Sequence, residues 1–236
     1  MAADRFGTPI QNALLLALPP RALGKLLPHL QQVPLTLKDT LERSGDRLEH
    51  AYFPQSGMIS ITVPLEDGRP VEVGTIGKEG MLGTTILLGS GIALNTAMVQ
   101  IEGSALRMLV PALRQQLGGD ASLREQVGLY AQSFYFQVAQ TAACNGSHSL
   151  NQRCARWLVL ARHRVGSDDF PLTHEFLAMM LAVERPGVTL AARALQQAGI
   201  IRYTRGHVTI LDPVRLETAA CECSRAIQAQ EARLLN

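Results

Sequence analysis

The segment that decides the fold lies in the C-terminal half of the chain: Thr173-His-Glu-Phe-Leu-Ala-Met-Met-Leu-Ala-Val-Glu-Arg-Pro-Gly-Val-Thr-Leu190, followed after four residues by Leu195-Gln-Gln-Ala-Gly-Ile-Ile201. Its pattern predicts two short helices. Thr173 is a typical N-cap for the first, which extends to about Leu181, because its hydroxyl accepts an amide hydrogen bond that the first turn leaves unused. Pro186 fits the first turn of the second helix, where an N–H has no partner within the helix, and Gly199 ends that helix.

The second helix has two different faces. At about 100° per residue, its apolar side chains gather on one side: Val188, Ala191, Ala192 and Leu195. Its polar side chains gather on another: Arg185, Thr189, Arg193 and Gln196. The polar face holds two arginines and no acid, which is typical of a helix that lies in the negatively charged major groove of DNA.

A hairpin follows the second helix. Two β-prone runs, 200–203 and 208–211, flank Thr204-Arg-Gly-His207 and place Arg205 at the tip. On the N-terminal side, Ser149-Leu-Asn-Gln152 is a capping box that opens a helix running to Val165. Two short helices joined by a tight turn and followed by a hairpin predict a winged helix-turn-helix.

The N-terminal part has a β texture after its leading apolar helices. Runs at 56–63, 70–76 and 97–101 are rich in Val, Ile and Thr and are bounded by glycines, and Asp67-Gly68 is a hairpin signal between the first two. Closely spaced short strands indicate a small β-barrel or a β-sandwich. The fold class is therefore predicted as α+β, with this β-domain first, then a long helix, then the winged helix-turn-helix.

A long helix is predicted between the two parts. Ser122-Leu-Arg-Glu125 is a capping box, and Asn145-Gly146 would end the helix after about residue 143. Four apolar side chains at 4-3-4 spacing form the expected dimer interface: Leu123, Val127, Tyr130 and Phe134. The apolar surface is wide enough to cover the barrel of its own chain as well. Burial as a core helix of a monomer fits the same periodicity.

Charge is distributed unevenly. The total of 22 basic and 20 acidic side chains gives only +2. Residues 150–236, however, hold eleven arginines, no lysine and eight acids, whereas residues 1–149 hold eleven basic and twelve acidic side chains. Arginine favours bidentate contacts to phosphate and guanine. The basic excess thus coincides with the predicted DNA-binding part.

Several other classes of protein are not expected. Four cysteines are too few for a disulfide scaffold, and with no secretory signal they predict a reduced, cytoplasmic protein. The uncharged stretch 81–101 is too polar for a membrane span. Cys221 and Cys223, even with Cys154, lack the usual companions of a zinc site, so free thiols and no metal are expected. Since no nucleophile–base pair is recognisable, no enzymatic role is expected.

The chain resembles the Crp/Fnr family of bacterial transcription regulators over nearly its whole length. The resemblance rests on Leu18-Pro-Pro20, Tyr52-Phe-Pro-Gln-Ser-Gly-Met58, Ile76-Gly-Lys-Glu-Gly-Met-Leu-Gly83 and, most specifically, the segment 173–201. It implies a sensor domain over 1–118 that is a jelly-roll β-barrel with leading helices, a dimerisation helix over 119–146 and a winged helix-turn-helix DNA-binding domain over 147–236. It also implies a homodimer on a double-stranded operator, with RNA polymerase and an unidentified small-molecule effector as further partners.

The resemblance also implies which residues contact DNA, although this chain differs from the family pattern at two of the three base-reading positions. Family members of the cyclic AMP type use Arg, Glu and Arg on the recognition helix, about 185–198 here. Arg185 matches the first, whereas Pro186 and Leu190 stand at the other two positions. Arg185 is therefore the expected base contact, and Pro186 offers only shape or a methyl contact. Phosphate contacts are expected from Thr173, His174, Thr189 and Arg205.

The expected effector pocket departs further. Cyclic-nucleotide binders of the family carry Gly-Glu for the ribose and Arg-Ser/Thr for the phosphate, where this chain has Gly83-Thr84 and Asn95-Thr96. A buried phosphate would lack its counter-charge, so cyclic AMP is not expected. The iron–sulfur branch uses N-terminal cysteines, but the first here is Cys144, so no iron–sulfur cluster is expected either. His29, His50 and His148 are expected to be surface or capping residues rather than haem ligands.

A second hypothesis stays open at this point. The chain could be a ligand-binding signalling module whose winged helix contacts another protein. The two hypotheses differ in salt dependence, because phosphate contacts make affinity fall steeply with ionic strength.

Overall fold

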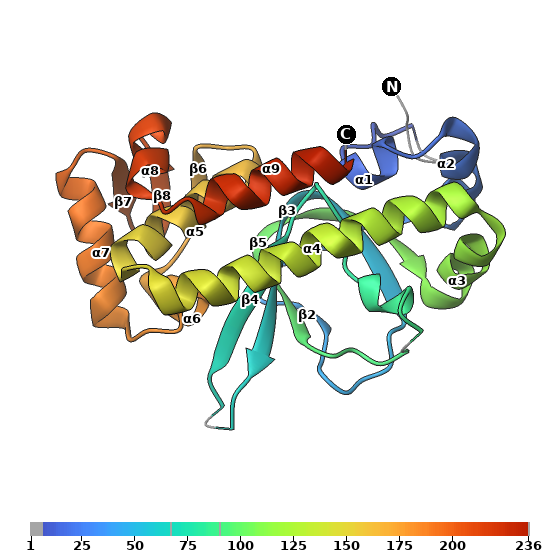
Figure 1. Cartoon of the computed structure of the whole chain (residues 1–236), viewed down its shortest axis with the longest axis horizontal. Helices are drawn as coiled ribbons and strands as arrows, with labels where there is room; N and C mark the ends of the chain where they lie inside the picture. Colours follow the sequence, from blue (N-terminus) through green and yellow to red (C-terminus); the bar gives the residue numbers. More distant parts are fainter. Residues whose placement is uncertain (1–6, 67, 90, 236) are drawn as a thin grey trace.

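The computed structural model describes residues 7–66, 68–89 and 91–235. A β-domain and a helical domain lie side by side, and one long helix, α4, runs across both (Figure 1). The N-terminal helices are α1 (Ala13–Leu16) and α2 (Pro20–Leu26), followed by the 3-10 turn η1 (Leu27–His29).

The β-domain, called the barrel below, is an antiparallel sheet in the order β1-β5-β3-β4, with β2 paired to β5. The strands are β1 (Gln31–Leu35), β2 (Thr40–Glu42), β3 (His50–Pro64), β4 (Pro70–Ile76) and β5 (Thr96–Leu109). The predicted strand regions are confirmed, but β3 and β5 are longer than expected. The predicted β3–β4 hairpin is confirmed by the pairing of Pro64 with Pro70, although Asp67 lies outside the described residues.

The uncharged stretch 81–101 belongs to this domain. It forms the 3-10 turn η2 (Thr84–Ile86) and the first part of β5. Among the described residues, no helix has the length and apolarity to cross a membrane.

The long helix starts two residues earlier and ends later than predicted. After α3 (Val110–Gly119), α4 spans Ala121–Ser147. Its N-cap is Asp120, whose side chain accepts from the amide of Leu123 at 3.3 Å and from the hydroxyl of Ser122 at 2.7 Å. The predicted capping box at Ser122 is therefore wrong, and Asn145-Gly146 does not end the helix.

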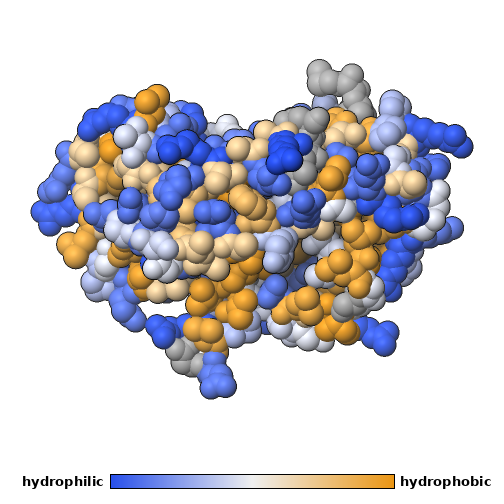
Figure 2. Space-filling model, viewed as in Figure 1, coloured by the Kyte–Doolittle hydropathy of each residue, from blue (hydrophilic) through white to orange (hydrophobic). Residues whose placement is uncertain are grey.

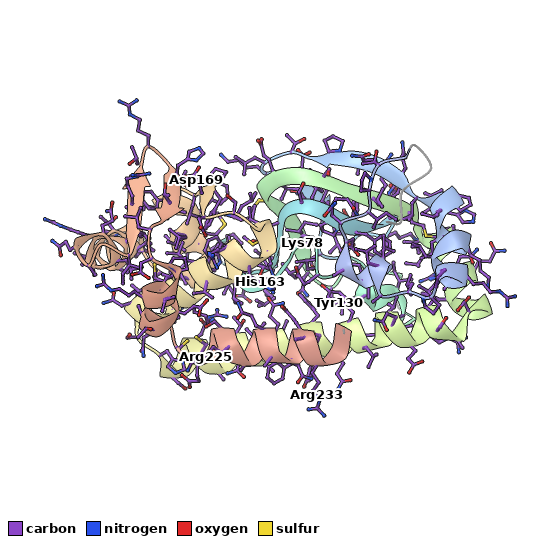
Figure 3. The ribbon with its side chains drawn as sticks, turned by 90° about the horizontal axis from the view of Figure 1, so that it is seen from above. Lys78, Tyr130, His163, Asp169, Arg225 and Arg233 are labelled. Carbon is purple, nitrogen blue, oxygen red and sulfur yellow. The ribbon has the colours of Figure 1, made fainter. Side chains whose placement is uncertain are left out.

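The predicted dimer residues of α4 face their own barrel. Leu123, Val127 and Tyr130 are buried in one core cluster with the N-terminal helices and α3, and Phe134 packs against it. Tyr130 lies directly on Gly80, where an added Cβ would fall 1.9 Å from the ring, and Figure 3 shows this tyrosine between α4 and the barrel. These side chains are thus part of the intrachain core, and a dimer would need another face of α4.

The helical domain begins with α5 (Leu150–Val165). The capping box of Ser149 and Gln152 is confirmed, and Gly166 ends the helix in the left-handed region as expected. The winged helix-turn-helix follows with β6 (Asp169–Pro171), α6 (His174–Leu181), α7 (Arg185–Gln197), β7 (Ile201–Thr204) and β8 (His207–Ile210). Residues 169–171, for which the sequence predicts no strand, form a third strand that pairs with β8.

Two helices complete the chain, α8 (Pro213–Ala219) and α9 (Cys223–Leu235). Helix α9 leaves the helical domain and runs back alongside α4, as Figures 1 and 3 show from two directions. The last helix therefore packs on the helix that connects the two domains.

Two buried polar networks also join the domains. In one, Oε1 of Glu79 lies 3.2 Å from Nε of Arg164 on α5, and Nη2 of that arginine lies 3.0 Å from Oε1 of Glu231 on α9. In the other, Glu72 of β4 accepts from Nε1 of Trp157 on α5 at 2.8 Å and from the Ser60 hydroxyl at 2.6 Å. Both networks fix α5 against the barrel.

Glu72 should make stability depend on pH. Burial raises the pKa of its carboxyl from 4.5 to about 7 in the folded protein, although its hydrogen bonds from Ser60 and Trp157 act in the opposite direction. The folded state therefore holds a proton that the unfolded state releases between these values, so the free energy of unfolding falls as pH rises through this window and levels off above it. The loss is at most about 3 kcal/mol.

The variant Glu72→Gln removes this titration, while its amide oxygen can still accept from Trp157 and its NH₂ group can donate to the Ser60 hydroxyl. We expect it to be more stable than the wild type at pH 8 by about 1–3 kcal/mol and close to it at pH 5. Urea midpoints measured from pH 5 to 8 test this, with Glu217→Gln on the exposed face of α8 as control. Parallel pH profiles for wild type and Glu72→Gln would refute the assignment.

Candidate nucleic-acid interface

The helix-turn-helix is built by local capping and one shared core. Thr173 caps α6 by accepting from the amide of Phe176 at 3.2 Å. Ala182 takes φ +51, which turns the chain, and α7 begins with a proline in its first turn. The apolar face predicted for α7 is confirmed: Val188, Ala191, Ala192 and Leu195 are all buried.

The opposite face of α7 is open to solvent. Arg185, Pro186, Thr189 and Arg193 are exposed, and Leu190 between them is 69% exposed. The hydroxyl of Thr189 donates to the carbonyl of Arg185 at 3.0 Å. The helix thus presents two unburied guanidinium groups without an acidic side chain between them.

Two predicted contact residues have internal hydrogen bonds. Oε1 of Gln196 accepts from the amide of Tyr203 at 2.9 Å, so Gln196 fastens α7 to the wing and keeps only its NH₂ group for a partner. His174 is half-buried, with Nδ1 3.1 Å from the Thr189 hydroxyl and its ring 4.4 Å from that of Tyr203.

His174 is a titratable group beside the exposed face of α7. Burial, and then the positive charge of Arg185, lower the pKa of His174 below its usual value. Its Nε2 is buried and has no hydrogen-bond partner among the described residues. The ring therefore links α6 to α7 through Thr189 and to the wing through Tyr203.

The wing is a three-stranded sheet in the order β6-β8-β7. Its tip is Arg205-Gly206, both with positive φ, and the Arg205 side chain is exposed. Strand β6 pairs with β8, and the Thr209 hydroxyl of β8 also donates to the Asp169 carboxylate of β6. Arg205 therefore extends from a hairpin that a third strand supports.

The helix-turn-helix also touches the barrel. A cavity of about 350 Å³ lies between the β3–β4 hairpin and the α6–α7 turn, with mainly apolar walls. At its edge Nη1 of Arg69 lies 3.8 Å from Oε1 of Glu184, the N-cap of α7. The start of α7 thus lies next to the β3–β4 hairpin of the β-domain.

The four predicted effector residues lie in two short segments between the end of β4 and the start of β5. Gly83 takes φ +106 and precedes η2, which begins with Thr84. Asn95 comes just before β5, and the Thr96 hydroxyl accepts from the amide of Ser44 at 3.3 Å. None of the four is charged, so they supply no counter-charge for an anion.

A different polar cavity, of about 410 Å³, lies beside β2 and the start of β3. Its lining includes Glu42, Arg43, Arg47 and His50. Burial raises the pKa of Glu42 to about 7. Sequence patterns gave no signal for this cavity, because its charges are spread over a strand and a loop.

Sequence reasoning also missed a side-chain cluster outside the interface. Cys144 and His148 lie beside Cys221 and Cys223, whereas Cys154 is buried elsewhere in α5. Only the return of α9 along α4 brings these segments together.

Comparison with known families agrees with this architecture. The model of the cyclic nucleotide-binding domain matches residues 33–119, and that of the Crp-like helix-turn-helix domain matches residues 152–219. Together the two models cover most of the chain. No curated protein sequence matches it significantly.

Solved structures share the fold at low sequence identity. FixK2 from Bradyrhizobium japonicum is 15% identical with a TM-score of 0.70, over 81% of this chain and 98% of its own. A transcriptional regulator of the Crp/Fnr family from Eubacterium rectale is 18% identical with a TM-score of 0.68, over 87% and 96%. A transcriptional regulator of the CRP family from Thermus thermophilus is 22% identical with a TM-score of 0.67, over 80% and 96%. With both domain models matched in this order on this fold, the chain belongs to the Crp/Fnr family of transcription regulators.

Proposed function

We propose that this protein is a sequence-specific DNA-binding regulator that inserts α7 into the major groove of its operator as a homodimer. The observation that carries the proposal is the exposed face of α7, where Arg185, Thr189 and Arg193 stand above a fully buried apolar face. The exposed Arg205 at the wing tip adds a cation where flanking phosphates would lie. Contact with RNA polymerase would belong to the same role.

Arg185 is the proposed base contact. It occupies the first turn of α7, the part of a recognition helix that approaches base edges. A guanidinium there can bind O6 and N7 of guanine. Pro186 and the exposed Leu190 can only fill space or contact a thymine methyl, so the half-site should differ from sites read through Arg, Glu and Arg.

We expect Arg185→Ala to weaken binding to a selected operator by about 1–3 kcal/mol and to relax one base position in each half-site. Fluorescence anisotropy and a repeated binding selection measure the two effects. Arg225→Ala is the matched control, because Arg225 is an exposed arginine on α9, away from the wing strand that carries Asp169 (Figure 3). An unchanged base preference in Arg185→Ala would remove Arg185 as the base contact.

The dimer interface is proposed on the outer face of α4. From residue 126 to 147 this helix has no charged side chain, yet Tyr135 is 73% exposed. A second heptad stripe lies on this face: Gly128, Ala131, Tyr135, Val138 and Ala142. Small residues let two helices approach closely, and Figure 2 shows weakly polar and apolar residues along the α4 band.

The sensor domain is proposed not to respond to cyclic AMP. The support is chemical: Gly83-Thr84 and Asn95-Thr96 contain no guanidinium for the phosphate and no carboxylate for the ribose. Isothermal titration of the purified protein with cyclic AMP should give no saturable heat, and saturable binding would contradict this part of the proposal.

A further inference from the structure

Four metal-binding side chains converge where α4 ends and α9 begins. The ligand atoms of Cys144, His148, Cys221 and Cys223 all lie within 4.8 Å of one another. All three cysteines are buried, and they form a small core cluster of their own. Two of the donors come from the end of the long helix, one from the α8–α9 connection and one from the first residue of α9, so the cluster joins distant parts of the chain.

Two of the donor–donor separations match the edges of a tetrahedral site. Sγ of Cys144 is 3.5 Å from Sγ of Cys221, and Sγ of Cys223 is 3.6 Å from Nδ1 of His148. Zinc–sulfur bonds of about 2.3 Å and zinc–nitrogen bonds of about 2.0 Å in a tetrahedron put neighbouring donors about 3.5–3.8 Å apart. With all four donors within 4.8 Å of one another, small side-chain shifts would bring them onto a single ion.

The surroundings are also those of a metal ligand set. Nδ1 of His148 faces the sulfurs, while its Nε2 lies 3.3 Å from Oε1 of Glu222. A carboxylate on the outer nitrogen is the usual way of orienting a ligating histidine. In addition, Nε2 of Gln140 donates to Sγ of Cys223 at 3.2 Å, which would stabilise a thiolate.

We propose that Cys144, His148, Cys221 and Cys223 bind one Zn²⁺ ion. Three thiolates and one imidazole suit zinc better than magnesium or calcium, which take oxygen ligands. On binding, the three thiols lose their protons to solvent and no electron is transferred. The ion would fasten the start of α9 to the end of α4, next to the turn into the DNA-binding domain.

Other uses of these residues explain less of the arrangement. A disulfide between Cys144 and Cys221 would need their sulfurs to close to about 2.05 Å, and it would leave Cys223, His148 and Glu222 without a role. An iron–sulfur cluster spreads its ligands over several irons, whereas donors this close together enclose one ion.

The test uses the full-length protein, purified under reductant without chelator. Elemental analysis should find one zinc per chain, and the cobalt-substituted protein should show the intense charge-transfer and d–d absorption of tetrahedral thiolate coordination. This cobalt spectrum needs no variant and therefore does not depend on whether a substitution folds. None of these readouts involves DNA, so they succeed or fail independently of the proposed function.

Variants then identify the ligands. In competition with a chromophoric chelator, Cys223→Ser should lose zinc affinity by at least about 100-fold, and Glu222→Gln by about 10–100-fold. Cys154→Ser, a buried cysteine outside the cluster, should bind zinc like the wild type. Circular dichroism checks that each variant is folded.

Three results would overturn the proposal. One is zinc binding of equal strength in Cys223→Ser and wild type. Another is iron and acid-labile sulfide in anaerobically purified protein. The third is a Cys144–Cys221 disulfide, found by mass spectrometry, whose formation zinc does not slow.

Discussion

Replacing Arg164 with methionine is expected to lower the free energy of unfolding by about 3–5 kcal/mol. The Arg164 side chain is 0% exposed, and it lies between the nearly buried carboxylates of Glu79 and Glu231. Without the cation these two acids would face each other in a region of low dielectric. Because they belong to the barrel turn and to α9, the loss should loosen both from α5.

The loss of stability in Arg164→Met should depend on pH. Burial raises the pKa of Glu231 to about 7, although the charge of Arg164 acts to lower it. Removing Arg164 takes away that lowering effect, so Glu231 can bind a proton more readily and relieve the repulsion. The difference in stability between wild type and Arg164→Met should therefore shrink as pH falls from 8 to 5.

Urea unfolding at both pH values measures these differences, with Arg162→Met as the matched control. Arg162 lies on the same helix and pairs with Asp168, but both side chains are partly exposed, so the control should lose less than about 1 kcal/mol. Equal losses in the two variants would show that the buried network does not hold the domains together.

The variant Tyr135→Asp is expected to abolish the dimer and to weaken operator binding by about 10²–10⁴-fold. In a twofold interface the substitution enters twice, and each aspartate would be buried against an uncharged helix face. A monomer contacts one half-site and loses the gain of binding two linked sites. Because Tyr135 is 73% exposed within its own chain, the fold of the protomer should be retained.

Light scattering and anisotropy on the selected operator measure the two consequences. Gln115→Asp, at an exposed position of α3, is the control and should remain dimeric. A Tyr135→Asp protein that is still dimeric would contradict the proposed interface. Phe134→Asp is unsuitable for this purpose, because Phe134 packs against the barrel of its own chain.

The winged helix-turn-helix could be predicted closely because its signals are local. Caps at Ser149 and Thr173, the proline at 186 and the apolar periodicity of α7 each act within a few residues. The start of α4 could not be predicted from the sequence, because Asp120 and Ser122 are both good N-cap residues. Asp120 is favoured by Lys25 of α2, whose Nζ lies 2.8 Å from its Oδ2.

Which face of α4 meets the barrel depends on contacts distant in sequence. The 4-3-4 apolar stripe is equally compatible with a partner helix and with the chain's own core. Tyr130 fits the core because Gly80 leaves room for its ring. The second stripe of α4, which contains Tyr135, is the one proposed for the dimer. Its residues are mostly small and only weakly hydrophobic, so the sequence pattern does not make it stand out.

In the candidate site, too, features that depend on local sequence could be predicted, and features that depend on distant contacts could not. The exposure of Arg185 and Arg193 follows from helix periodicity alone. The contacts that His174 and Gln196 make within the chain do not follow from helix periodicity, because both involve Tyr203 of the wing. Likewise, Cys144 and Cys221 are separated by 77 residues in sequence, and only the path of α9 makes them neighbours.

The most direct test of the central claim is a binding selection from random duplex DNA, followed by salt titration of the selected duplex. If α7 of a dimer reads the major groove, the selected sites will contain two inverted half-sites about one helical turn apart. The logarithm of the affinity will then fall linearly and steeply with the logarithm of salt concentration. No enriched sequence, together with binding that salt does not weaken, would contradict it and favour a winged helix that contacts protein.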